Sequence, residues 1–297
     1  MIEWLNKIYC IDNLELLKQL PDECIDLIYC DILYNTGKRF NDFNDNLGTP
    51  QQAIEWYRPR LIEMKRVLKE TGSIYLQCDY RLVHYLKIEM DDVFGLSNFR
   101  NEIIWNYGGA SPTKSNFARK HDTILFYSKT NNYKFNPVYG DKLPEYLYKR
   151  ARKDSDGRLW VDQNLGKLNE DTINKMKAEG KVFTTLSGKL RRKQYLDEMP
   201  GEQLNDTWND IPIINSQAKE RVSYNTQKPK KLLERIVKAS SNEGDVVADF
   251  FCGSGTSLVV AKELGRNYIG CDINPRAVEI TNKRLNDIKL SKQQRLF

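Results

Sequence analysis

The glycine-rich stretch of this sequence reads Asp249-Phe250-Phe251-Cys252-Gly253-Ser254-Gly255-Thr256. Residues 246–250 form a short apolar run of strand character, and residues 257–264 after the stretch have helical periodicity. Glycines let a backbone approach a ligand closely, and the first turn of a helix offers free N–H groups. A strand, a glycine-rich turn and a helix in this order therefore predict a cradle for a nucleotide-like ligand in an α/β fold.

A second strand-like run, residues 267–272, follows the helical segment and ends in Asp272. A carboxylate at the end of this strand is well placed to accept hydrogen bonds from the hydroxyls of a ribose. In an ordinary dinucleotide-binding domain such a unit comes first along the chain. Here it comes late, so we expect the segments on its N-terminal side to supply the remaining strands of the sheet.

The N-terminal side contains a strand-like run at residues 25–31 that ends in Asp31. Two apolar residues, Tyr34 and an Asn-Thr-Gly turn at residues 35–37 follow the acid. An acid at the end of a strand more often caps a turn or a helix than performs chemistry. The aromatic residue three positions on and the distant glycine-rich turn make Asp31 a candidate catalytic group.

Together, residues 31–34 and 249–256 resemble the two motifs of the S-adenosylmethionine-dependent amino-methyltransferases of DNA. The catalytic motif of that family is an Asp, Asn or Ser, two prolines or apolar residues, and an aromatic residue. Its cofactor motif is Phe-x-Gly-x-Gly. Here the catalytic motif comes first, which matches the permuted beta class. Residues 221–237 resemble the family segment before the cofactor motif, and residues 31–38 and 192–198 resemble modification subunits of type III restriction systems.

The resemblance implies roles for individual residues. It assigns catalysis to Asp31, to the backbone carbonyl of Ile32 and to Tyr34. The cofactor-binding residues that it implies are Asp12, Asp31, Thr226, Lys228, Asp249, Phe251, Gly253, Gly255, Thr256 and Asp272. A simple turn acid is nearly as good an interpretation of Asp12. The residues expected to bind DNA are Lys38, Arg39, Lys189, Arg191, Arg192 and Lys193, and for the last four an ordinary solvated surface is the alternative.

The expected reaction is methylation of an exocyclic amine, whose lone pair is delocalised into the base. Asp31 can accept a hydrogen bond from one N–H of the amine, and the carbonyl of Ile32 can accept one from the other. Both contacts stabilise the positive charge that develops as the methyl group transfers. Tyr34 would stack on a base that has been rotated out of the DNA helix.

The sequence departs from the family at three positions. Ile32 and Leu33 stand where prolines are usual, and so does Phe250 after the acid of the cofactor motif. A proline fixes φ, so without it the carbonyl of residue 32 is aimed less rigidly, which concerns efficiency more than reaction type. Because family members with an initial Asp are mostly adenine-specific, the predicted target is adenine N6 in double-stranded DNA. The alternatives are cytosine N4, a DNA-binding protein of the same fold with little turnover, and methylation of RNA or a protein side-chain amide.

Strand-like and helical runs alternate over most of the chain, which indicates a Rossmann-like, mainly parallel sheet with helices on both faces. The predicted strands are residues 25–31, 73–78, 102–107, 123–127, 246–251 and 268–272, and the predicted helices are 51–68, 82–94, 230–240, 256–264 and 275–288. The alternation fails between residues 133 and 216. We predict a catalytic part at 1–132, an inserted target-recognition module at 133–216 and a cofactor-binding part at 217–297, with loops 35–48 and 108–120 beside the active site.

The composition predicts a cytoplasmic protein that meets a polyanion. Residues 1–99 carry 11 Lys and Arg against 16 Asp and Glu, whereas residues 142–199 carry 14 against 9, so basic residues gather in the predicted insert. A solvated, lysine-rich surface is the alternative. With six scattered cysteines and two histidines we expect no metal site, and we expect neither a membrane span nor a signal peptide. The resemblance adds a restriction endonuclease subunit and a homodimer to the partners to be considered.

Overall fold

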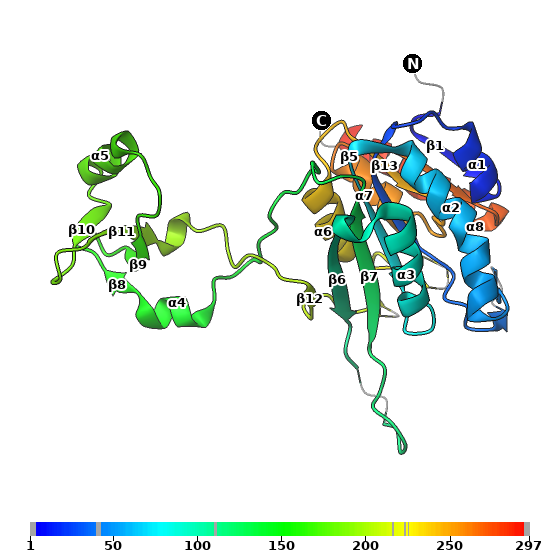
Figure 1. The fold of residues 1–297 in the computed structure, drawn as a ribbon, viewed down its shortest axis with the longest axis horizontal. Helices are drawn as coiled ribbons and strands as arrows, with labels where there is room; N and C mark the ends of the chain where they lie inside the picture. Colours follow the sequence, from blue (N-terminus) through cyan, green and yellow to red (C-terminus); the bar gives the residue numbers. More distant parts are fainter. Residues whose placement is uncertain are drawn as a thin grey trace. The chain divides into compact units, whose positions relative to one another are not determined.

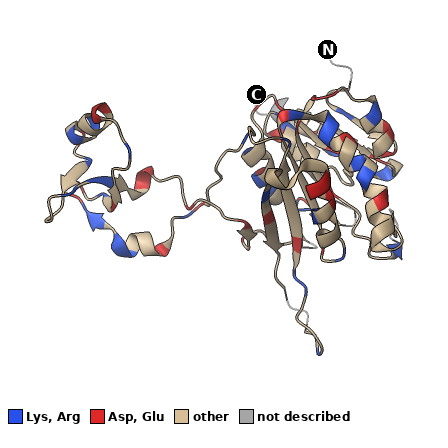
Figure 2. Ribbon diagram, in the orientation of Figure 1, with Lys and Arg blue, Asp and Glu red and all other residues tan. Residues whose placement is uncertain are grey.

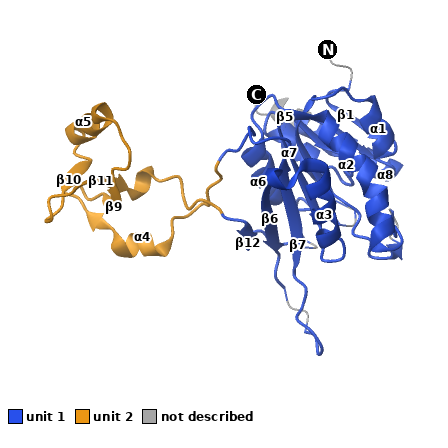
Figure 3. Cartoon of the chain, viewed as in Figure 1, with its two compact units in different colours: residues 1–136, 205–297 blue, residues 137–204 orange. Residues whose placement is uncertain are grey.

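The computed structural model divides the chain into two compact units (Figure 3). The first comprises residues 1–136 and 205–297, and the second comprises residues 137–204. The residues that the structure describes are 4–39, 43–109, 112–215, 217–222, 224 and 226–293, with side chains described up to residue 288. The predicted loops 35–48 and 108–120 are therefore described except for residues 40–42 and 110–111.

An eight-stranded sheet forms the centre of the first unit (Figure 1). Among its described strands only β7 runs against its neighbours, so the prediction of a mainly parallel sheet is confirmed. Across the sheet, the strands are β1 (Lys7–Cys10), β14 (Asn267–Asp272), β13 (Val246–Asp249), β2 (Ile25–Asp31), β5 (Leu68–Cys78), β7 (His121–Ser128), β6 (Phe99–Asn106) and β12 (Thr207–Trp208). The strand before the glycine-rich turn thus pairs directly with the strand that ends in Asp31.

Helices cover both faces of this sheet, as the alternation predicts (Figure 1). One hydrophobic core packs α1 (Asn13–Gln19), α2 (Pro50–Val67) and α3 (Val83–Phe94) against the first face. The other packs α6 (Lys230–Ser240), α7 (Thr256–Glu263) and α8 (Pro275–Gln293) against the second. Side chains of a strand alternate between faces, so Ile28 and Cys30 of β2 enter the first core while Leu27 and Tyr29 enter the second. Among the described residues, no helix is long and apolar enough to cross a membrane.

The ends of the elements follow their local chemistry. Thr49 caps α2 in a reciprocal capping box with Gln52, and Pro50 occupies the first turn, where it displaces no helical hydrogen bond. Asn274 precedes α8, and its side chain accepts a hydrogen bond from the Arg276 N–H at 2.9 Å. Short elements complete this unit, namely η1 (Leu96–Asn98) and the hairpin of β3 (Lys38–Arg39) and β4 (Asn44–Asp45).

The second unit has its own small antiparallel sheet, in the order β10 (Val182–Thr184), β11 (Leu190–Tyr195), β9 (Leu159–Asn164) and β8 (Arg152–Lys153). The helices α4 (Glu145–Arg150) and α5 (Glu170–Ala178) and the short turn η2 (Leu196–Glu198) accompany it. Trp160, whose ring centroid lies 5.1 Å from that of Phe183, is buried here together with Tyr195.

This unit is narrower than the predicted insert of residues 133–216. On its N-terminal side, the Lys134 ammonium binds Asp26 at 2.9 Å and Asp245 at 2.7 Å, both of which belong to the first unit. On its C-terminal side, β12 pairs with β6 of the large sheet. Polar composition alone could not reveal these contacts, because both flanks look like loops until their partners are known.

Candidate active site

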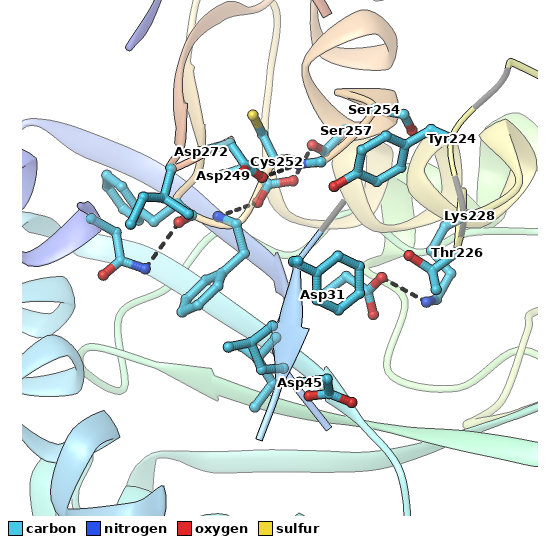
Figure 4. A pocket seen from close by; sticks show the side chains of 18 of the residues that line it. Asp31, Asp45, Tyr224, Thr226, Lys228, Asp249, Cys252, Ser254, Ser257 and Asp272 are labelled. Atoms are coloured by element: carbon cyan, nitrogen blue, oxygen red, sulfur yellow. Dashed lines mark hydrogen bonds and ion pairs between the residues drawn. The ribbon is translucent and has the colours of Figure 1, made fainter. Parts of the chain in front are cut away.

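A cavity of about 420 Å³ opens in the first unit where β2, β13 and β14 end (Figure 4). The glycine-rich turn lines one part of it, and the residues that follow β2 line another. Further lining comes from the segment 226–228 and from residues 11–13 after β1. Ligands of open α/β sheets bind at this edge, outside the carboxyl ends of the strands. Except for Gly255, the candidate catalytic and cofactor-binding residues therefore border one cavity, although they come from both ends of the sequence.

The glycine-rich turn requires both of its glycines. Gly253 and Gly255 have φ values of 49° and 70°, in the left-handed region that side chains disfavour. A Cβ atom at Gly255 would overlap the Thr281 side chain, and one at Gly253 would lie 3.1 Å from the Tyr224 ring. The turn consequently presents bare backbone to the cavity just before α7 begins.

The Asp249 carboxyl group holds this turn through two hydrogen bonds. Its Oδ1 accepts the Phe251 N–H at 3.0 Å, and its Oδ2 accepts the hydroxyl of Ser257. The carboxyl group is buried, and this burial raises its pKa to about 7. Since both oxygens already bind the protein, Asp249 shapes the turn.

Asp272 holds the other side of the turn. Its Oδ2 accepts the N–H of Gly253 at 2.9 Å, and its Oδ1 accepts the N–H of Asn274 at 2.9 Å. A carboxylate has about four lone-pair sites and can accept several hydrogen bonds at once. The residue is partly exposed and lines the cavity, as the ribose-binding prediction requires.

Asp12 is a turn acid that also lies at the cavity, and the cofactor-binding role that the resemblance implies for it stays a prediction. Its Oδ1 caps α1 by accepting the Leu14 N–H at 2.8 Å, so it is a turn acid. Its Oδ2 binds Arg60 at 2.8 Å, and the residue also lines the cavity. Arg60 is fixed in turn by Trp56, whose ring centroid lies 3.4 Å from the guanidinium carbon.

Three further predicted residues lie at or near the cavity. Thr226 has a φ of 65° and is exposed, while Phe251 is half-buried with its ring centroid 6.2 Å from that of Tyr57. The Thr256 hydroxyl accepts a hydrogen bond from Arg284 at 3.1 Å.

Asp31 ends β2 and carries two polar contacts. Its Oδ2 lies 2.6 Å from the ammonium of Lys228, which Figure 4 shows beside it. Its Oδ1 accepts the Tyr34 hydroxyl at 2.8 Å. Burial raises the pKa of Asp31, and the Lys228 charge opposes that rise.

The Tyr34 hydroxyl also contacts a residue that was not predicted to belong to the site. It lies 2.9 Å from Oδ2 of Asp122, which also accepts the Gln77 amide at 2.9 Å. Gln77 in turn accepts the Tyr29 hydroxyl at 2.7 Å. The sequence signal for this network was the presence of two polar residues, Gln77 and Asp122, in otherwise apolar strands. A buried polar side chain needs a hydrogen-bond partner.

The backbone after Asp31 is held by side chains in place of prolines. The Tyr57 hydroxyl donates to the Leu33 carbonyl at 2.9 Å. The Asp45 carboxylate accepts the N–H groups of Asn35 at 2.9 Å and Thr36 at 3.0 Å. Within the described residues, no hydrogen bond reaches the carbonyl of Ile32, so this acceptor stays available.

The predicted DNA-binding residues are not equivalent. Lys38 and Arg39 are exposed in β3. In the second unit, Arg191 binds Asp162 and Lys193 binds Asp154 at 2.6 Å, so acids already neutralise two cations of the predicted cluster. Acidic residues are interspersed with basic ones throughout this unit (Figure 2). Lys189 is exposed, whereas Arg192 is partly buried.

The cavity fits a nucleoside with a positively charged substituent. Gly253 brings backbone without a side chain to the cavity, the Asp272 carboxylate lines it, and the apolar Phe251 and Ile273 offer surface for a flat ring. Asp31 places a carboxyl group in the same cavity. Within the described residues, no group of three His, Cys, Asp or Glu side chains could hold a metal ion.

Comparison with known proteins gives one family. A family model described as DNA methylase, for N6 and N4 methylation, matches residues 25–283. The type II methyltransferase M.EcaI of Enterobacter cloacae is 31% identical over 87% of the chain and 64% of its own length, so this chain spans about two thirds of that relative. The DNA adenine methyltransferase YhdJ of Escherichia coli (strain K12) is 29% identical over 93% of the chain and 81% of its own length.

Solved structures agree on the fold. The cytosine-N4-specific PvuII DNA methyltransferase has a TM-score of 0.58 at 17% identity, with 94% of this chain and 85% of that chain covered. The putative DNA modification methylase TTHA0409 of Thermus thermophilus, solved with S-adenosylmethionine, has a TM-score of 0.56 at 17% identity, with 94% and 93% covered. M.EcaI is described as a type II enzyme, and the resemblance to type III modification subunits stays a prediction.

Proposed function

Because the chain belongs to the family of N6 and N4 DNA methylases, we propose that it transfers a methyl group from S-adenosylmethionine to the N6 amine of adenine in double-stranded DNA. One observation carries the proposal. Asp31 and the carbonyl of Ile32 lie at the end of β2, in the same cavity as the glycine-rich turn. A methyl donor in the turn and an amine at Asp31 would then share one enclosed space.

The cofactor supplies an electrophilic methyl group on a sulfonium sulfur. The bare backbone at Gly253 would allow it to approach, Gly255 would keep the turn packed on Thr281, and Asp272 would accept its ribose hydroxyls. Asp12 lines the cavity with its carboxylate fixed by Arg60, and Thr226 lies at its exposed side. Asp249 supports the site from behind, because its two oxygens hold the turn.

The residues after β2 would bind and orient the amine. Asp31 accepts one N–H and the carbonyl of Ile32 accepts the other, which restores the lone pair to nitrogen and stabilises the charge that develops there. Burial raises the pKa of Asp31, and the Lys228 charge opposes that rise and so favours the ionised carboxylate. The Tyr34 ring is available to stack on the base that leaves the helix.

The contacts of Tyr57 and Asp45 with the backbone after Asp31 bear on the alternative of a DNA-binding protein with little turnover. Tyr57 holds the carbonyl of Leu33, and Asp45 holds the turn that follows. The Tyr57 contact falls on one of the two positions where prolines are usual, and the Asp45 contacts fix the turn just after them, so the missing prolines do not argue for lost activity. Cytosine N4 stays the second candidate target, since the amine of cytosine needs the same two acceptors.

The second unit is the proposed target-recognition module. Its support is its position in the chain, its compact core and its excess of basic residues. DNA would be contacted there by cations that lack an acidic partner, and beside the cavity by Lys38 and Arg39. The restriction endonuclease subunit, the homodimer and the cytoplasmic location stay predictions.

The test is methylation of DNA by purified protein with isotopically labelled S-adenosylmethionine. Digestion to nucleosides and mass spectrometry separate N6-methyladenine from N4-methylcytosine. We expect label in N6-methyladenine and no transfer by Asp31→Ala, whose cofactor binding should persist. Label in cytosine would replace the proposed base, and no label in any nucleoside would contradict the proposed reaction.

A further inference from the structure

Asp122, the second residue of β7, is a buried carboxyl group. Its Oδ2 lies 2.9 Å from the Tyr34 hydroxyl and 2.9 Å from the amide nitrogen of Gln77. The same Tyr34 hydroxyl lies 2.8 Å from Oδ1 of Asp31. One hydroxyl therefore stands between two carboxyl groups that come from different strands.

A phenol hydroxyl carries one proton, so Tyr34 can give a full hydrogen bond to only one of these carboxyl groups at a time. If Asp31 is protonated, it can donate to the Tyr34 oxygen while Tyr34 donates to Asp122. The hydrogen bonds then run in one line from Asp31 to Asp122. A proton can pass along this line with little movement of heavy atoms.

We propose that Asp122 receives, through the Tyr34 hydroxyl, the proton that the target amine loses on methylation. This inference rests on the function proposed above. As the nitrogen–carbon bond forms, the sulfur–methyl bond breaks and leaves its electron pair on sulfur, and the amine nitrogen then holds one proton too many. Oδ1 of Asp31 takes that proton, Tyr34 takes it from Asp31, and Tyr34 gives its own proton to Asp122. Tyr34 ends unchanged, the base has lost one proton, and Asp122 has gained one.

The charges around the two carboxyl groups favour this direction. The ammonium of Lys228 binds Oδ2 of Asp31 at 2.6 Å and stabilises its ionised form. Within the part of the chain that the structure describes, no Lys or Arg forms an ion pair with Asp122. The Lys228 charge therefore disfavours a proton on Asp31 and favours its transfer toward Tyr34. The other titratable groups that face the pair are Tyr29, Tyr107, Asp79 and Asp249.

Two substitutions separate proton transfer from a structural role. Tyr34→Phe keeps the ring that stacks on the base and removes the hydroxyl. Asp122→Asn keeps an oxygen that accepts from both Tyr34 and Gln77, but an amide does not take up the proton. Tyr75→Phe is the matched control, because it removes another buried hydroxyl, which lies 2.7 Å from Ser240 and outside the cavity.

The measurement is the single-turnover rate of methyl transfer over a pH series, with KM for DNA and cofactor binding by calorimetry. The fluorescence of 2-aminopurine at the target position reports the extruded base. Tyr34→Phe and Asp122→Asn should each lower the rate about 100-fold, within the range of general acid–base catalysis. KM, cofactor binding and fluorescence should match those of the wild type. Asp122→Asn should also shift the acid limb to lower pH, because burial and then the Asp122 charge raise the pKa of Asp31.

Each other outcome contradicts a definite claim. An active wild type with an unchanged rate in Tyr34→Phe overturns the relay and leaves the proposed function intact. A rate lost together with base extrusion gives Tyr34 and Asp122 a structural role and overturns the relay as well. A loss confined to Tyr34→Phe removes Asp122 from the path. A wild type that methylates no DNA overturns the proposed function, and the relay with it.

Discussion

The ammonium nitrogen of Lys228 lies 2.6 Å from Oδ2 of Asp31, although 197 positions separate the two residues in the chain. The contact joins the segment before the cofactor motif to the acid of the catalytic motif. The Lys228 charge opposes the rise that burial causes in the pKa of Asp31. The cofactor-binding role that the resemblance implies for Lys228 stays a prediction.

Replacing Lys228 by Ala should move the acid limb of the pH–rate profile to higher pH. Burial raises the pKa of Asp31, and Lys228 is the charge that opposes this rise, so its loss lets burial act alone. The measurement is kcat/KM over a pH series. Lys231→Ala is the control, since Lys231 pairs with Asp210 at 3.3 Å. An acid limb that stays in place would show that Lys228 does not set the charge of Asp31.

Restoring a proline at position 32 and restoring one at position 33 should have different effects on the stability of the protein. Ile32 donates its N–H to the Gln77 carbonyl at 3.3 Å, and proline has no N–H to donate. Ile32→Pro should therefore lower the free energy of unfolding by about 1 kcal/mol. Leu33→Pro removes no hydrogen bond that the described residues make, and it should be tolerated. Denaturant unfolding checks both, and equal losses would contradict this account.

Gly255→Ala should destabilise the protein and weaken cofactor binding. The new Cβ would overlap Thr281, and φ is 70° at this position. We expect a loss of about 1–3 kcal/mol in the free energy of unfolding, measured by denaturant titration. Gly244→Ala is a matched control for backbone strain, because φ is 84° there and nothing lies within 4 Å of the added Cβ. A similar loss in both variants would mean that strain, rather than the overlap, sets the cost.

Asp249 should make the protein less stable as the pH rises from about 4 to about 7. Its folded pKa is about 7, above that of the unfolded chain, so between these values the folded state holds a proton that the unfolded state has lost. In that window the free energy of unfolding should fall by about 1.4 kcal/mol per pH unit from this group. Asp249→Asn should flatten the dependence in urea titrations. A variant with the slope of the wild type would place the titrating group elsewhere.

The four basic residues Lys189, Arg191, Arg192 and Lys193 of the second unit should act as two pairs, one that binds DNA and one that stabilises the unit. Lys189→Ala with Arg192→Ala should weaken DNA binding and reduce its salt dependence by roughly 0.9 per lost phosphate contact. Arg191→Ala with Lys193→Ala should mainly cost stability, because these cations hold Asp162 and Asp154. Binding titrations at several salt concentrations separate the pairs. A larger salt effect from the second pair would contradict the assignment.

Much of the first unit was predictable, because its signals are local. The runs 25–31 and 230–240 match β2 and α6 at both ends, since apolar periodicity marks a buried strand and an amphipathic helix directly. Short elements were not predicted from the sequence. Helix α1 has seven residues, too few for periodicity to appear, and its cap Asp12 looked like a turn acid.

The candidate site was predictable as a set of residues and not as a set of contacts. Asp31, Asp272 and Gly253 follow from strand ends and turn composition, and they line the cavity. The pairs of Asp31 with Lys228 and of Tyr34 with Asp122 depend on which strands become neighbours. No local pattern carries that information. The ion pairs that neutralise Arg191 and Lys193 could not be predicted from the sequence for the same reason.

The position of β2 between β13 and β5 has a consequence for synthesis on the ribosome. Strand β5 is made soon after β2, but β13 begins only at Val246, and β1 must wait still longer for β14. Until then one edge of β2 is open, and an open apolar edge can pair with the edge of another chain. A nascent chain that stalls before β13 would therefore expose the strand that carries Asp31. Its yield should depend on chaperones that cover this edge until the last strands emerge.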